Sequence, residues 1–136
     1  MSRKYKGRTV LIIEDDTDCW NFVSKVLELE GYDVLQVKDG DLGIKITRET
    51  SVVLILMDLR LTGCDGWSVL NELKSNSELS EIPVIVLTAS AEMSKREMAM
   101  KMGATGYLVK PFGTDDLRRA IANVLLQEES CYHAVK

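Results

Sequence analysis

The chain has 136 residues, of which 46% are hydrophobic and 28% charged, so it can form one ordinary domain with a hydrophobic core and has little room for a second. Its formal net charge of −4 argues against direct binding of nucleic acid, because phosphate backbones are bound by basic surfaces. The longest apolar run, residues 52–57, is too short to cross a bilayer, and the basic residues 1–8 lack the apolar stretch of a signal peptide.

The three cysteines, Cys19, Cys64 and Cys131, are odd in number and show no CxxC spacing. This pattern favours free thiols in a reducing compartment over a disulfide framework. The sequence therefore predicts a cytoplasmic protein without a membrane partner.

Short apolar runs alternate along the chain with segments whose apolar residues recur at helical spacing. In chain order, the expected strands are residues 9–13, 33–37, 52–57, 83–87 and 106–109. The first helix carries an apolar stripe made of Cys19, Phe22, Val23, Val26 and Leu27, and Gly31 is expected to end it. The later helices are expected over residues 42–49, around Trp67, Leu70 and Leu73, over residues 97–102 before Gly103, and over residues 117–126.

Five strands that alternate with five helices require crossover connections, and such connections give a parallel sheet covered on both faces. The predicted fold is α/β: a doubly wound (βα)5 arrangement with a five-stranded parallel sheet, as in flavodoxin-like proteins. The run 52–57 is the most hydrophobic and is expected at the centre of the sheet.

Functional groups in such sheets gather beyond the carboxyl ends of the strands. The residues at those positions are Glu14-Asp15-Asp16, Asp58, Thr88-Ala89-Ser90 and Lys110-Pro111-Phe112. Taken singly, each has a structural explanation, since acidic residues after a strand often cap a helix and a lone Thr or Lys says little. Their joint occurrence at four strand ends favours a functional site.

The carboxylates of Glu14, Asp15 and Asp58 should repel one another and so take up a cation. Oxygen ligands without a nearby His or Cys select a hard ion, and Mg²⁺ is the expected cofactor. Thr88 would add a hydroxyl and Lys110 a positive charge. Together these groups can hold the oxygens of a transferring phosphoryl group.

Four motifs occur in this order: LIIEDD, LILMDLRLTGCDGW, PVIVLTAS and GATGYLVKPF. With them the chain resembles the receiver domain of two-component response regulators, the CheY-like family, across about residues 8–128. The resemblance implies that Asp58 is the phosphoacceptor and that Glu14, Asp15, Asp58 and the backbone carbonyl of Arg60 bind Mg²⁺. It further implies a switch hydroxyl on Thr88, a coupled aromatic ring on Tyr107, a phosphate partner in Lys110 and a cis bond between Lys110 and Pro111.

Two positions depart from the family pattern. Glu14 stands where an aspartate is common, and its extra methylene should preserve metal binding. The segment Leu61-Thr62-Gly63 stands where leucine-proline-glycine is usual. The lost proline should loosen this loop without changing the chemistry.

The expected function is that of a phosphoacceptor, with self-catalysed phosphotransfer and autodephosphorylation, rather than that of a turnover enzyme. A sensor histidine kinase or a histidine phosphotransfer protein would donate the phosphoryl group, and a downstream effector protein would read the result. The expected domain spans residues 1–136, with a core over about 8–128 and a tail over 130–136.

Three alternative functions agree less well with the sequence. A flavoprotein of the same topology needs a hydroxyl-rich phosphate loop, whereas the loop here is Glu14-Asp15-Asp16. An aspartyl phosphatase usually carries a second aspartate two residues after its nucleophile, and Arg60 occupies that position. A degenerate receiver that acts only as a binding module would have lost site residues, and all are present.

Trp20 lies beside the polar residues Asn21, Ser24 and Glu28 on the expected first helix, which predicts an exposed tryptophan. Exposed aromatic residues are enriched at binding hot spots. The resulting hypothesis is that Trp20 helps to dock the phosphodonor. The alternative is that it folds over a neighbouring helix or over the N-terminal arm, residues 1–8. Trp67 is expected at the rim of the core.

Overall fold

The structure, a computed structural model, describes residues 8–61 and 64–135, and the side chains of residues 8–61 and 65–125. The strands are β1 (Thr9–Ile13), β2 (Asp33–Val37), β3 (Val52–Asp58), β4 (Arg60–Leu61), β5 (Cys64–Asp65), β6 (Val84–Thr88) and β7 (Gly106–Val109). The helices are α1 (Thr17–Leu29), α2 (Gly40–Glu49), α3 (Gly66–Ser75), α4 (Met93–Lys101) and α5 (Thr114–Val135).

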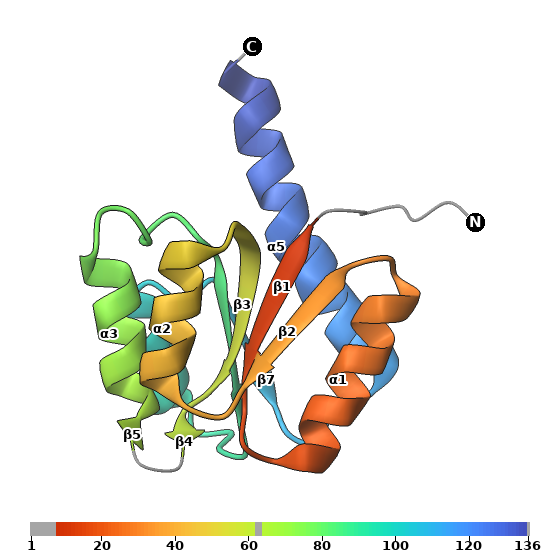
Figure 1. The fold of residues 1–136 in the computed structure, drawn as a ribbon, viewed down its shortest axis with the longest axis vertical. Coiled ribbons are helices and arrows are strands. Elements are labelled where there is room, and N and C mark those ends of the chain that lie inside the picture. Colours follow the sequence, from red (N-terminus) through yellow and green to blue (C-terminus); the bar gives the residue numbers. More distant parts are fainter. Residues whose placement is uncertain (1–7, 62–63, 136) are drawn as a thin grey trace.

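Five strands form one parallel sheet in the order β2-β1-β3-β6-β7, which confirms the predicted doubly wound fold with residues 52–57 at its centre. Figure 1 shows α2 and α3 on one side of this sheet and α1 on the other. Two hydrophobic clusters correspond to these faces: one holds the buried residues of α2, α3 and α4, and the other those of α1 and α5. The centres of β1, β3 and β6 are buried between them, as expected for a parallel sheet.

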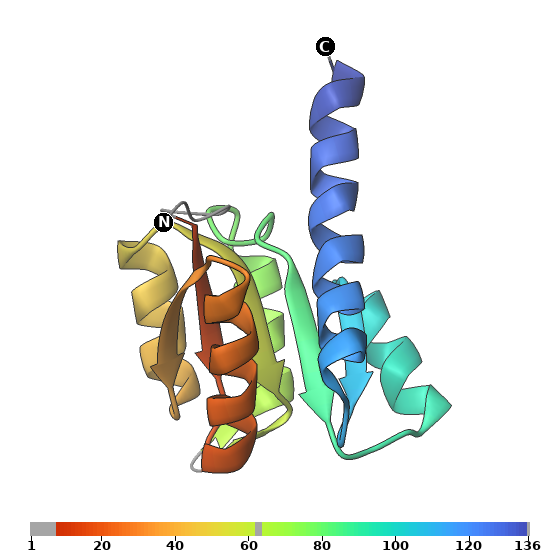
Figure 2. The ribbon, with the colours of Figure 1, turned by 90° about the vertical axis from the view of Figure 1, so that its right-hand side faces the viewer.

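Helix α5 is longer than the sequence pattern predicted, since it begins at Thr114 and continues to Val135 rather than ending near residue 126. No glycine or proline occurs between these bounds, so nothing in the sequence terminates the helix earlier. Figures 1 and 2 show that α5 extends past the sheet at the edge opposite to the carboxyl ends of the strands.

The predicted exposure of α1 is wrong at three positions. Ser24, expected on the polar side, is buried and accepts a hydrogen bond from the Gln36 amide of β2. Trp20 is partly buried, and the Lys38 ammonium lies 5.4 Å from its ring centroid. Phe22, expected in the buried stripe, is 37% exposed. The helix is therefore turned so that its Ser24 side faces β2, which a helical period alone does not reveal.

A short antiparallel pair of strands, β4 and β5, follows β3 and was not predicted. Asp65 caps α3 by accepting a hydrogen bond from the Trp67 backbone N–H at 3.1 Å. Gly66 packs tightly there, since a Cβ atom on it would lie 2.5 Å from the Leu59 Cα. The proline-lacking loop contains Thr62 and Gly63, which lie outside the described residues. Trp67 packs at the rim of the core, as predicted.

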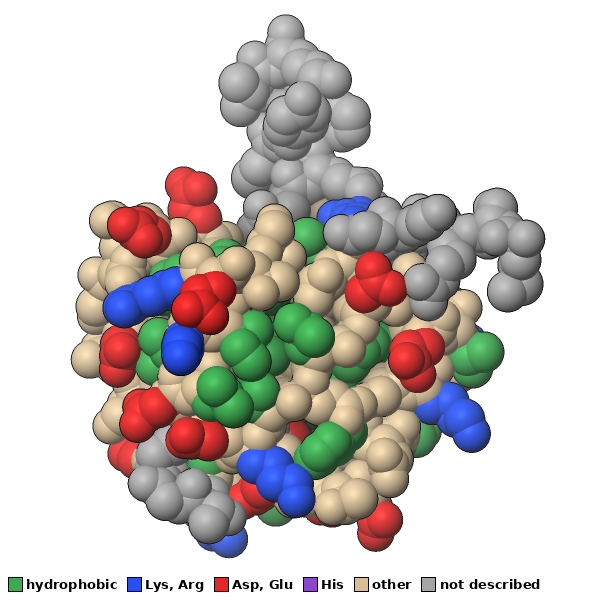
Figure 3. Space-filling model, in the orientation of Figure 1, with side chains coloured by type: hydrophobic (Ala, Val, Ile, Leu, Met, Phe, Trp, Pro, Cys, Tyr) green, Lys and Arg blue, Asp and Glu red, His purple; other side chains and the backbone are tan. Residues whose placement is uncertain are grey.

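Figure 3 shows the face that carries α2, β2 and α1, where hydrophobic side chains gather between acidic and basic ones. Leu35 of β2 and Leu42 of α2 are 36% and 44% exposed. Within residues 8–61 and 64–135, none of the helices combines the length and hydropathy of a membrane-spanning segment.

Candidate functional site

The polar residues that follow the parallel strands meet at one edge of the sheet because the strand registers align them. Ile13 of β1 lies opposite Met57 of β3, so Glu14 and Asp58 are the next residues on neighbouring strands. Thr88 lies opposite Val109, and the Lys110 backbone N–H donates to the Thr88 carbonyl at 2.7 Å. Lys110 is therefore held beside the carboxyl end of β6.

The centre of the site is a cluster of three carboxylates. Glu14, Asp15 and Asp58 each offer one oxygen, and these oxygens all lie within 4.8 Å of one another. Glu14 is fully buried and Asp58 is 7% exposed, while Asp15 is partly buried. Oxygen ligands at this spacing suit a hard divalent cation that keeps some of its waters. This donor set fits Mg²⁺ and offers no thiolate or imidazole that would favour a softer metal.

Lys110 bridges two of these carboxylates. Its Nζ lies 2.5 Å from Glu14 Oε1 and 2.9 Å from Asp58 Oδ2, and the ammonium donates a hydrogen bond to each. The Lys110 side chain is 18% exposed. One partly buried cation, the Lys110 ammonium, thus compensates part of the negative charge that the strand ends bring together.

The pKa values reflect this arrangement. Burial raises the pKa of Glu14 above its usual range, and the hydrogen bond with Asp58 adds to the effect, while Lys110 opposes it. Burial alone would lower the pKa of Lys110, but the hydrogen bonds to Glu14 and Asp58 outweigh burial and raise it. Lys110 therefore stays protonated at neutral pH.

Backbone N–H groups hold the remaining carboxylate oxygens in place. The Arg60 N–H donates to Asp58 Oδ1 at 2.9 Å, and the Asp16 N–H donates to Glu14 Oε2 at 3.2 Å. In both cases the donor lies two residues after the acid, a local turn pattern typical of acidic residues that leave a strand. Asp16 itself caps α1 by accepting from the Asp18 N–H at 3.0 Å.

On the other side of the site, Thr88 is 5% exposed, and its Oγ1 accepts a hydrogen bond from the Ser90 N–H at 3.1 Å. The Tyr107 hydroxyl donates to the Ser90 carbonyl at 3.1 Å. Burial raises the pKa of Tyr107, so the phenol stays neutral and remains a donor. Ser90 thus joins the hydroxyl at the site to an aromatic ring on the edge strand β7, a connection that the sequence did not reveal.

Sequence reasoning also missed a small hollow of about 240 Å³ beside Lys110, lined by Cys19, Phe22, Pro111 and Phe112 among others. The Phe22 and Phe112 ring centroids are 6.1 Å apart in a tilted arrangement. Burial and the neighbouring Glu14 raise the pKa of the Cys19 thiol to about 12, so it is unreactive at neutral pH. Only the positions of Cys19 and Phe22 on one helical stripe could have hinted at this hollow.

The structure thus brings together the predicted side chains Glu14, Asp15, Asp58, Thr88 and Lys110 at one sheet edge. The Lys110–Pro111 bond is cis, as the resemblance implied. Arg60 lies in β4, and its backbone N–H contacts Asp58; the metal-binding role of its carbonyl stays a prediction.

The sequence is similar to those of known transcriptional regulators. A chain that is 33% identical over 127 residues is the DNA-binding dual master transcriptional regulator RpaA of Synechocystis sp.; the match covers 93% of this chain and 53% of RpaA. The chain spans about half the length of such curated relatives.

Solved structures of response regulators share the fold of this chain. The chemotaxis response regulator CheY4 of Vibrio cholerae superposes with a TM-score of 0.80 at 26% identity, covering 86% of this chain and 98% of CheY4. The Mn²⁺-bound form of response regulator Rcp1 gives 0.73 at 27% identity, covering 86% and 91%. The response regulator receiver domain model matches residues 10–122. The chain therefore belongs to the family of response regulator receiver domains.

Proposed function

We propose that Asp58 is the phosphoacceptor of this receiver domain. The observation that carries the proposal is that Asp58 ends the central strand, lies within 4.8 Å of two further carboxylates and has the Lys110 ammonium 2.9 Å from its Oδ2. Phosphorylation of an aspartate is the general function of the family. An anionic nucleophile beside a fixed cation is suited to accept a phosphoryl group.

Glu14, Asp15, Asp58 and the Arg60 carbonyl would hold Mg²⁺. The bound ion would supply positive charge to neutralise the phosphoryl oxygens during transfer. The oxygen-only donor set supports this assignment, and the related regulator Rcp1 was solved with Mn²⁺ bound.

In the transfer step, an Asp58 carboxylate oxygen forms a bond to phosphorus while the bond between phosphorus and the donor histidine nitrogen breaks. The product is an acyl phosphate, and the released imidazole takes up a proton. Asp58 Oδ1 is held by the Arg60 N–H, so we assign the attack to Oδ2, where Lys110 can pass its hydrogen bond to a phosphoryl oxygen. In autodephosphorylation, water attacks phosphorus, and the bond between phosphorus and the Asp58 oxygen breaks. Asp58 is thereby released as a carboxylate.

The switch would run through Thr88. When its hydroxyl turns towards the new phosphoryl group, the Ser90 N–H loses its present partner, Thr88 Oγ1. The Tyr107 hydroxyl holds the Ser90 carbonyl, so Tyr107 can turn inwards as this segment moves. The affected surface comprises α4, β7 and α5, which a downstream effector would read.

Family members work with sensor kinases, and the donor here would be a phosphohistidine on such a kinase or on a phosphotransfer protein. The hollow lined by Phe22 and Phe112 opens beside Lys110 and supports docking of the donor there. The Lys38 ammonium lies over the Trp20 ring, whereas Phe22 is exposed. Phe22 therefore replaces Trp20 as the residue proposed to contact the donor protein.

The test is phosphorylation by acetyl phosphate and Mg²⁺, followed by intact-mass spectrometry. Wild-type protein should gain the mass of one phosphoryl group, and Asp58→Asn should gain none. Asp65→Asn is a matched control, since Asp65 is an exposed acid whose side chain caps α3. Labelling of Asp58→Asn at the wild-type level would refute the assignment.

A further inference from the structure

Strand β2 forms one edge of the sheet. It pairs with β1 on one side, and no other strand among the described residues pairs with its outer side. The Asp33 N–H donates to the Arg8 carbonyl at 3.0 Å, so the backbone groups of Asp33 face β1. Since alternate residues of a strand direct these groups to opposite sides, Val34 and Gln36 direct theirs away from β1. The outer side of β2 therefore offers two N–H and two C=O groups to a further strand.

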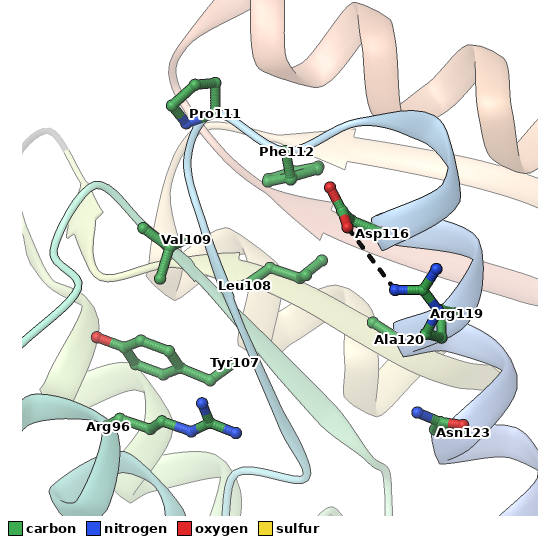
Figure 4. Close-up of a pocket in the computed structure, with 10 residues that line it drawn as sticks. All are labelled: Arg96, Tyr107, Leu108, Val109, Pro111, Phe112, Asp116, Arg119, Ala120 and Asn123. Carbon is green, nitrogen blue, oxygen red and sulfur yellow. Dashed lines mark ion pairs between the residues drawn. The ribbon is translucent and has the colours of Figure 1, made fainter. Parts of the chain in front are cut away.

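The opposite edge of the sheet is less suited to adding a strand. Figure 4 shows β7 between α4 and α5, with Arg96 on one side and Asp116 and Arg119 on the other. Charged side chains beside an edge strand hinder pairing with another chain. In contrast, the segment Val34-Leu35-Gln36-Val37 of β2 is uncharged. The edge at β2 is therefore the one that favours strand pairing.

Side chains on both faces of β2 also leave room for a partner. Val37 belongs to the hydrophobic cluster on the α2 side, so Leu35, two residues away, points to the same face. Leu35 and Leu42 of α2 are 36% and 44% exposed, and Figure 3 shows hydrophobic side chains gathered on this side of the molecule. On the other face, Gln36 contacts Ser24 and lines a groove of about 590 Å³ beside α1. A strand added to β2 would cover both surfaces.

We propose that the added strand is β2 of a second copy of the chain, paired antiparallel around a twofold axis at Leu35. In this register, Val34 of each copy lies opposite Gln36 of the other as a hydrogen-bonded pair, which uses the outward backbone groups of both strands. Leu35 lies opposite Leu35 of the second copy as a non-hydrogen-bonded pair, in which side chains come closest. The groove beside Gln36 receives Val34 of the second copy. The result is a dimer with one continuous sheet, an assembly separate from phosphoryl transfer.

The sequence of β2 favours a second copy over an unrelated peptide, because the strand matches itself in this register. Asp33 lies opposite Val37 of the second copy, and Lys38 lies opposite Tyr32. No like charges therefore face each other across the pair. Each chain has one such edge, so a twofold axis closes the assembly at two copies.

Sedimentation velocity of the unphosphorylated full chain at increasing concentration tests the proposal. Wild type should change from monomer to dimer. Leu35→Lys places two like charges opposite each other at the axis and removes an apolar pair, so it should raise the Kd of the dimer about tenfold or more. Met98→Lys is the matched control, because it makes the same change of charge at a residue of α4 that is 55% exposed. It should change the Kd by less than about twofold.

A cross-link provides a second readout that does not depend on the folding of Leu35→Lys. Residues of a non-hydrogen-bonded antiparallel pair have Cα atoms about 4.5 Å apart, which suits a disulfide. Leu35→Cys treated with oxidised glutathione should therefore form a disulfide between two chains at position 35. The two thiols lose their protons and two electrons, and oxidised glutathione is reduced to two glutathione molecules. Peptide mapping distinguishes this bond from any that involves the native cysteines, and Met98→Cys should form none at position 98.

Three results would overturn the proposal. The first is a wild-type chain that stays monomeric at every concentration and a Leu35→Cys chain that forms no disulfide at position 35. The second is a dimer that folded Leu35→Lys leaves intact. The third is a dimer that Met98→Lys dissociates, since this result would place the contact at α4 instead of β2.

Discussion

Glu14 is the residue on which the electrostatics of the site depend most. It is fully buried, and both of its oxygens accept hydrogen bonds, one from Lys110 and one from the Asp16 N–H. A buried carboxylate of this kind is retained at a cost in stability, since its charged form loses hydration. That cost can be measured on the unphosphorylated protein, as a contribution to its free energy of unfolding.

The free energy of unfolding should therefore decrease as pH rises in metal-free buffer. The pKa of Glu14 is raised above 4.5 in the folded protein, so between the two values the folded state binds more protons than the unfolded state. Lys110 stays protonated throughout this window and adds no slope. In Glu14→Gln the decrease should be smaller. Urea unfolding in EDTA from about pH 4.5 to about pH 8 measures it, and equal slopes in both proteins would rule out Glu14 as the source.

At the scale of elements, the junction between β3 and α3 is held by a close backbone approach. A Cβ atom on Gly66 would lie 2.5 Å from the Leu59 Cα and 2.6 Å from its carbonyl oxygen. Gly66→Ala should therefore reduce the free energy of unfolding by about 1–3 kcal/mol and slow phosphorylation by acetyl phosphate. Gly113→Ala is the control, because the nearest atom to its Cβ is 3.7 Å away. Chemical denaturation compares the two, and equal losses would contradict the packing argument.

Helix α1 provides a second prediction at this scale. Phe22→Ala should slow phosphoryl transfer from a histidine-phosphorylated donor protein, because it removes half of the aromatic pair beside Lys110. Transfer from acetyl phosphate should stay unchanged, since this small donor needs no docking surface. Leu29→Ala, at the far end of α1 and 74% exposed, is the control. Equal transfer rates for Phe22→Ala and wild type with the protein donor would show that the hollow does not take part in docking.

The elements also show where sequence reasoning succeeds and where it stops. Apolar runs and helical spacing predicted the sheet, and the rule for parallel strands placed Asp58, Thr88 and Lys110 at one edge. The helical period does not show how α1 is rotated against the sheet, where Ser24 contacts Gln36 of β2, Trp20 is partly buried and Phe22 is 37% exposed. The bridge from Lys110 to Glu14 joins residues far apart in sequence, and only the fold reveals it.

For the whole molecule, metal binding should couple to stability. The native state alone gathers the carboxylates of Glu14, Asp15 and Asp58, so only the folded chain offers a complete site. Mg²⁺ should raise the melting temperature, with about 1.4 kcal/mol gained at ten times its Kd. Asp15→Asn should melt higher than wild type without metal, because it relieves repulsion, and should respond less to Mg²⁺. Calorimetry with and without Mg²⁺ checks both, and an unchanged wild-type melting temperature would mean that the cluster is not a metal site.

The central claim is that Asp58 carries the phosphoryl group, and reductive trapping tests it most directly. Borohydride reduces an aspartyl phosphate to homoserine, which marks the modified residue permanently. After treatment with acetyl phosphate and Mg²⁺, peptide sequencing by mass spectrometry should find homoserine at position 58 and an unmodified Glu14 and Asp15. Homoserine at another aspartate, with residue 58 intact, would contradict the account.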